Sequence, residues 1–169
     1  MNAPRKYSLV LAIYPNARGF AYVLFEGPLA PVDWAVVEVR GKLKNRQCIR
    51  RVSQLFGAFA PDAVALQHMG EAPFHRATRI RDLNASLALL AETQGIPMFT
   101  FSRMQVRQRF AHLGSVTKQA VAENIAKRIP VFERFLPPIR KIWMSEDARM
   151  GMFDAAALGL TFFENVPAR

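Results

Sequence analysis

With 169 residues, the chain fits a single domain, expected over residues 1–169, that can bury a hydrophobic core without disulfides or a structural metal. Hydrophobic residues make up 51% of the sequence, which excludes a chain that is disordered over most of its length. The 23 lysines and arginines outnumber 13 acidic residues, and the net charge of +10 favours a polyanionic partner, nucleic acid before an anionic membrane.

Cysteine usage and the amino-terminal segment indicate the cellular compartment in which the protein is expected. Cys48 is the only cysteine, so an internal disulfide is excluded and a reducing compartment is favoured. It has no histidine at metal-ligand spacing, so no structural zinc site is expected. The apolar run near the amino terminus is too short to span a bilayer, and no cleavage pattern follows it. We therefore expect a cytoplasmic protein that does not act at a membrane.

The first part of the chain has the pattern of short strands joined by tight links. An apolar run over 7–14 ends at a proline, and a second run over 19–26 is rich in aromatic and β-branched residues. A third segment, 32–40, alternates apolar and polar side chains. Three such strands in succession predict an antiparallel meander.

Strands and helices alternate in the rest of the chain. The periodicity predicts helices and strands in turn, with the last three segments all helical and with Ser102 and Thr117 as N-caps. In chain order these are helix 41–61, strand 62–68, helix 74–95, strand 96–101, and helices 102–114, 115–130 and 150–165. A meander followed by strand–helix alternation indicates an α/β fold with a mixed sheet covered by helices.

Four stretches occur in an informative order: "LAIYPNARGFAYVLF", "PDAVALQHM", "RQRFAHLGSVTKQAVAENIAKRIP" and "MFDAAALGLTFF". They resemble the first hairpin, the fourth strand, the lysine-containing segment and the carboxy-terminal helix of the RuvC-like Holliday junction resolvases, which belong to the RNase H-like superfamily. The resemblance implies an RNase H-like fold, with a five-stranded mixed sheet of an antiparallel meander plus parallel strands, flanked by helices. It also favours DNA over RNA as partner and suggests a homodimer.

The resolvases cut DNA with two divalent ions held by four acidic positions. By resemblance, these positions fall on Tyr14, Gln67, Gly151 and Asp154, of which Asp154 alone carries a charge. Hard ions such as Mg²⁺ need oxygen ligands that are usually charged. The sequence therefore predicts a degenerate site, with no cofactor and no activity by the usual two-metal mechanism.

A relocated acidic site around Asp154 is the alternative. Asp147, Glu71 and His68 could join Asp154, and Mg²⁺ or Mn²⁺ would then be required. The favoured interpretation treats Glu146 and Asp147 as solvated or capping acids before a helix, and Glu71 as a loop acid. Asp154 and Asp147 remain the metal-ligand candidates.

Basic residues remain where the acids are missing. Residues 101–145 contain nine lysines and arginines but only two acids. Lys118 lies just inside a predicted helix start, where an ammonium group and free backbone N–H groups can bind one phosphate together. Each basic residue alone could be an ordinary solvated charge, but the set favours a nucleic-acid interface. The candidate contacts are Arg18, Arg103, Arg107, Lys118, Arg140 and Lys141.

The position of Trp143 has two interpretations. It could be exposed beside Arg140 and Lys141, suited to stacking or a partner contact, or it could fill the core beneath a loop. The predicted function is that of a degenerate RuvC-like protein that binds structured or branched nucleic acid through a basic face. A nuclease with a relocated site and a protein-interaction module for an acidic partner are the alternatives.

Overall fold

The computed structural model describes residues 6–68 and 78–167. Its centre is a five-stranded sheet in the order β3-β2-β1-β4-β5. The strands β1 and β2 pair antiparallel, as do β2 and β3, whereas β4 pairs parallel with β1 and with β5. The expected meander and mixed sheet are confirmed. The strand bounds are β1 Val10–Asn16, β2 Gly19–Phe25, β3 Pro31–Glu38, β4 Ala63–Gln67 and β5 Met98–Phe101.

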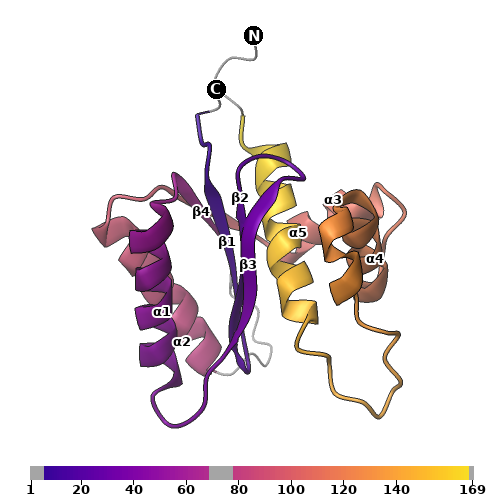
Figure 1. Ribbon diagram of the computed structural model, residues 1–169, viewed down its shortest axis with the longest axis horizontal. Coiled ribbons are helices and arrows are strands. Elements are labelled where there is room, and N and C mark those ends of the chain that lie inside the picture. Colours follow the sequence, from indigo (N-terminus) through magenta and orange to yellow (C-terminus); the bar gives the residue numbers. More distant parts are fainter. Residues whose placement is uncertain (1–5, 69–77, 168–169) are drawn as a thin grey trace.

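Helices cover both faces of the sheet (Figure 1). One layer holds α1 and α2, and the other holds α5, with α3 and α4 beyond it. The bounds are α1 Lys44–Phe59, α2 Thr78–Thr93, α3 Arg103–Ala111, α4 Lys118–Arg128 and α5 Met150–Asn165. A short 3-10 helix, Pro130–Phe135, follows α4 in a stretch for which no helix or strand was predicted beyond residue 130. The first four residues of the helix expected over 74–95 lie outside the described ranges.

Alternation along the strands divides the core into two halves. Leu11 and Ile13 of β1 pack with α1 and α2, whereas Val10, Ala12 and Tyr14 pack on the side of α5. Successive side chains of a strand point to opposite faces, so Tyr14 belongs to the α5 side by register alone. The same alternation in β4 puts Ala63 and Ala65 on that side.

The helix α5 lies between the sheet and the outer helices. Twelve of its residues are buried, so it is apolar around most of its circumference, as a central helix requires. Small residues let it approach the sheet closely: a Cβ on Gly159 would overlap the ring of Phe25. Among the described residues, no helix is long and apolar enough to cross a membrane.

We predict that Gly159→Ala lowers the free energy of unfolding by about 1–3 kcal/mol, because the added methyl group overpacks the contact with Phe25. Gly57→Ala is the matched control, since Gly57 is exposed on α1 and a Cβ there meets nothing within 4 Å. The control should gain about 0.5–1 kcal/mol from helix propensity. Urea denaturation with linear extrapolation measures both. An equal gain in both variants would contradict the close packing of α5.

Candidate functional site

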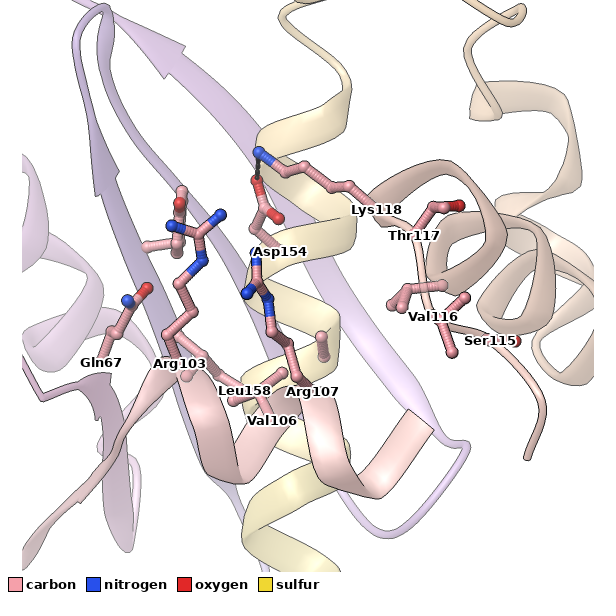
Figure 2. A pocket seen from close by; sticks show the side chains of 13 residues that line it. Gln67, Arg103, Val106, Arg107, Ser115, Val116, Thr117, Lys118, Asp154 and Leu158 are labelled. Carbon is pink, nitrogen blue, oxygen red and sulfur yellow. Dashed lines mark ion pairs between the residues drawn. The ribbon is translucent and has the colours of Figure 1, made fainter. Parts of the chain in front are cut away.

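Three of the four positions assigned by resemblance lie together at the carboxyl ends of strands β1 and β4. Ile13 of β1 pairs with Leu66 of the parallel strand β4, so the next residues, Tyr14 and Gln67, lie side by side. Together with Asp154 from α5 they line a cleft of about 210 Å³ (Figure 2). Among the residues that the structure describes, Asp154 is the one carboxylate in this lining. We call the cleft lined by Tyr14, Gln67 and Asp154 the first cleft.

Gly151, the fourth position, lies in a second cleft that shares Tyr14, Lys118 and Asp154 with the first. A Cβ on Gly151 would lie 2.9 Å from Asn16 Nδ2. The Asn16 side chain is fixed by the hairpin turn, where its Oδ1 accepts hydrogen bonds from the backbone N–H groups of Arg18, at 3.0 Å, and Gly19, at 3.1 Å. A larger side chain at position 151 therefore requires the side-chain amide of Asn16 to move.

Lys118 supplies a cation to this site. Its Nζ lies 3.0 Å from Asp154 Oδ2 and donates to Glu146 Oε1 at 2.6 Å, and it lies 5.9 Å from the centre of the Tyr14 ring. Figure 2 shows the lysine reaching from the start of α4 to Asp154 on α5. Partial burial alone would lower the pKa of Lys118. The interactions with Asp154 and Tyr14 and the hydrogen bonds to Glu146 and Asp154 outweigh burial and raise that pKa. The ammonium therefore stays charged at neutral pH.

The residues of the first cleft do not fit a pair of divalent ions. Asp154 is already paired with an ammonium group, and Tyr14 and Gln67 bring no charge. In residues 6–68 and 78–167, no three or more His, Cys, Asp or Glu side chains are grouped so that they could hold a metal ion.

Asp147 forms a local turn ahead of α5. Its carboxylate accepts hydrogen bonds from Arg149 Nη2 at 2.7 Å, and from Arg149 Nε and the Arg149 backbone N–H, both at 2.9 Å. The hydrogen bonds from the Arg149 side chain are the main cause that lowers the pKa of Asp147, to about 2. Asp147 also lines the second cleft. Of the other candidates for a relocated site, His68 is exposed at the end of β4, and Glu71 lies outside the described residues.

Two arginines border the first cleft from α3. Ser102 and Gln105 form the capping box that starts this helix, so the predicted cap is confirmed. Arg103 and Arg107 follow one turn apart, and Figure 2 shows both side chains extending from α3 into the cleft. Arg109 faces elsewhere and pairs with Glu164 at 2.8 Å.

The start of α4 forms the opposite wall. Thr117 caps this helix, as predicted, by accepting a hydrogen bond from the Ala120 N–H at 3.0 Å. Residues 115–118 line the first cleft. Backbone N–H groups of the first helical turn carry a partial positive charge, which adds to that of Lys118.

A third cleft extends this basic region toward the loop before α5. It shares Arg18, Glu146, Asp147 and Ala148 with the second cleft, and Arg140 lines it. Lys141 lies on the same loop, outside the linings of these three clefts. Adjoining clefts thus bring together five of the six basic residues that the sequence proposed: Arg18, Arg103, Arg107, Lys118 and Arg140.

Two contributors to the site were not foreseen as such. Glu146 holds Lys118 from 28 residues away, and Asn16 fills the space beside Gly151. Glu146 has no motif that marks it. The Pro-Asn-Ala-Arg-Gly turn was the one available signal for Asn16, because asparagine side chains commonly bond to the backbone two residues on.

Comparison with known proteins gives the fold. No protein-family model matches the chain, and no curated protein matches it. Among solved structures, Thermus thermophilus RuvC in complex with Holliday junction substrate has a TM-score of 0.65 at 21% identity, covering 90% of this chain and 91% of that one. T. thermophilus RuvC also matches in a second structure, with a TM-score of 0.64 at 22% identity and coverage of 90% and 92%.

The yeast mitochondrial Holliday junction resolvase Ydc2 matches with a TM-score of 0.58 at 14% identity, covering 91% of this chain and 78% of that one. The chain therefore has the RuvC-like form of the RNase H-like fold, as the sequence predicted.

We predict that Asp154→Asn lowers the pKa of Lys118 relative to the unmodified protein, because burial then acts against a weaker opposing charge. An NMR titration of the lysine side-chain resonances measures this pKa. Asp147→Asn is the matched control, since Asp147 pairs with Arg149 and should leave the titration of Lys118 in place. An unchanged pKa of Lys118 in Asp154→Asn would show that the ion pair with Asp154 does not raise this pKa.

Proposed function

We propose that this protein binds structured or branched nucleic acid, DNA in preference to RNA, along its three clefts and does not cut it by two-metal hydrolysis. One observation carries the proposal: among the described residues, the first cleft has arginines on its wall and Asp154 as its one carboxylate, and Asp154 is paired with Lys118. The cleft thus offers cations to a phosphate backbone and few ligands to a metal.

The distribution of charge supports backbone binding. Arg103 and Arg107 are exposed, and a planar guanidinium can donate two parallel hydrogen bonds to a phosphate. Arg18 continues the positive charge along the second and third clefts. Basic residues spaced along adjoining clefts suit a polyanion better than a single small anion.

The state of the acids supports a site without nuclease chemistry. A two-metal site needs several carboxylates converging on the ions. Here Asp154 pairs with Lys118 at 3.0 Å, and Asp147 pairs with Arg149 at 2.7 Å. A metal ion in either place would have to displace a cation from its partner.

The structural neighbours suggest which ligand to try first. T. thermophilus RuvC has been solved in complex with a Holliday junction substrate, and this chain shares its fold over 90% of its length. A four-way junction is therefore the first probe, compared with duplex and single strands of DNA and RNA.

We predict that affinity for a four-way DNA junction falls steeply with salt, because binding releases the counterions of each neutralised phosphate. Arg103→Ala and Arg107→Ala should each weaken binding and make the slope of log K against log salt shallower by about 1. Fluorescence anisotropy across a salt series measures both quantities. Arg46→Ala and Arg50→Ala are matched controls, because these exposed arginines lie on α1, across the sheet from the clefts. No binding to any probe at low salt would refute the proposal.

We predict that binding needs no divalent ion and persists in EDTA, and that no probe is cleaved in Mg²⁺ or Mn²⁺. The reason is that one lysine-paired carboxylate provides too little negative charge for two dications. Gel assays of labelled junction and duplex test this. Metal-dependent cleavage that is abolished by Asp154→Ala would show an active nuclease instead, and loss of that cleavage in Asp147→Ala as well would assign the relocated site.

A further inference from the structure

The loop between the 3-10 helix and α5 carries an unusual group of exposed hydrophobic side chains. Ile142 is fully exposed, at 101%, Trp143 is 79% exposed and Ile139 is 77% exposed. Figure 1 shows the loop projecting beyond α4 and away from the sheet before it returns to α5. Large exposed apolar side chains gathered in one segment are typical of an interaction site. Of the two interpretations left by the sequence, exposure of Trp143 holds.

Cations accompany the apolar side chains. Arg140 and Lys141 are exposed between Ile139 and Ile142, and the segment 138–144 contains no acid. Lys141 Nζ lies 5.3 Å from the centre of the Trp143 ring, within the range of a cation–π contact. The loop therefore offers an aromatic face with positive charge beside it.

The loop is tied to the clefts at its far end. Arg18 Nη2 donates to the backbone oxygen of Glu146 at 2.9 Å, and Lys118 Nζ donates to the Glu146 carboxylate at 2.6 Å. Arg140 and Met144 of the loop line the third cleft together with Arg18. A polyanion in the third cleft would therefore lie against this loop at Arg140 and at Met144, the residue that follows the exposed tryptophan.

We infer that Trp143 stacks on an unpaired base of a nucleic acid whose backbone lies in the clefts, with Arg140 and Lys141 beside the adjacent phosphates. This inference rests on the proposed function and adds to it the substrate feature recognised. Bases stack on aromatic side chains whatever their sequence, because every base has a π face, whereas a paired duplex keeps these faces covered. The protein should thus prefer branched, bulged or single-stranded substrates to a closed duplex.

An anionic membrane is the other surface that isoleucine, tryptophan, arginine and lysine could enter. The ties of Glu146 to Arg18 and Lys118 favour nucleic acid, because they place the loop against the clefts rather than on an independent apolar face. Vesicles are therefore included in the test.

The test compares two DNA hairpins with the same stem and the same tight closing loop. The stem of one is fully paired, and the stem of the other carries a bulge of several unpaired bases. Trp143→Ala should weaken binding to the bulged hairpin about tenfold, within a range of about fivefold to 100-fold, and change binding to the paired one less than about twofold. Trp143→Phe should restore most of the lost affinity, since it keeps an aromatic face. Leu89→Ala, which removes a 63% exposed side chain from α2 across the sheet, should change neither.

Fluorescence gives a direct readout of stacking. The chain has two tryptophans, and Trp34 is partly buried and packs against Phe132 and Phe135. In a Trp34→Phe background with an unchanged melting temperature, the emission reports Trp143 alone. It should be quenched by the bulged hairpin and unchanged by the paired one. If that background melts early, the same quenching is measured as the difference between unmodified protein and Trp143→Ala.

The outcomes separate this inference from the proposed function. If neither hairpin binds, both fail. If both bind and Trp143→Ala has no effect, or weakens both equally, stacking is refuted while nucleic-acid binding stands. If vesicles of phosphatidylglycerol and phosphatidylcholine shift the emission of Trp143 to shorter wavelength and the bulged hairpin does not quench it, the loop is a membrane contact and the inference is overturned.

Discussion

The close approach of α5 to the sheet is the constraint from which the rest of the site follows. At two glycines the helix has no side chain of its own between its backbone and the strands. Gly159 lies against the ring of Phe25 on β2, and Gly151 lies against the side chain of Asn16 at the end of β1. Because helix and strands are fixed against each other at both points, the side chain of Asp154 must emerge beside the ends of β1 and β4. The outer helices then cover the exposed side of α5 and bring their amino-terminal residues to the same place.

That geometry sets an electrostatic requirement in the first cleft. A carboxylate that is mostly removed from water needs a cation or hydrogen-bond donors to remain ionised. Lys118 satisfies Asp154 with one charge and gains a second partner in Glu146. In a site with several carboxylates, divalent ions would meet the same requirement. Tyr14, Gln67 and Gly151 carry no negative charge, so the single positive charge of Lys118 is enough to balance Asp154.

Local patterns in the sequence accounted for much of this arrangement. The resemblance put Tyr14 at the end of the first strand, and the Ser102 and Thr117 caps fixed where α3 and α4 begin, and hence where Arg103, Arg107 and Lys118 lie. Contacts between distant segments have no such local signal. The bond between Glu146 and Lys118, and the exposure of Trp143, depend on how the loop leaves the 3-10 helix Pro130–Phe135. A run of prolines and charged residues does not specify that course.

Glu146 links the two parts of the proposed interface. Its carboxylate bonds to Lys118 in the cleft, and its backbone oxygen bonds to Arg18 at the hairpin, so the end of the Trp143 loop is held by the same cations that would meet a phosphate backbone. A phosphate approaching either cation competes with Glu146 for it. Backbone binding and the position of the end of the loop therefore depend on the same two cations.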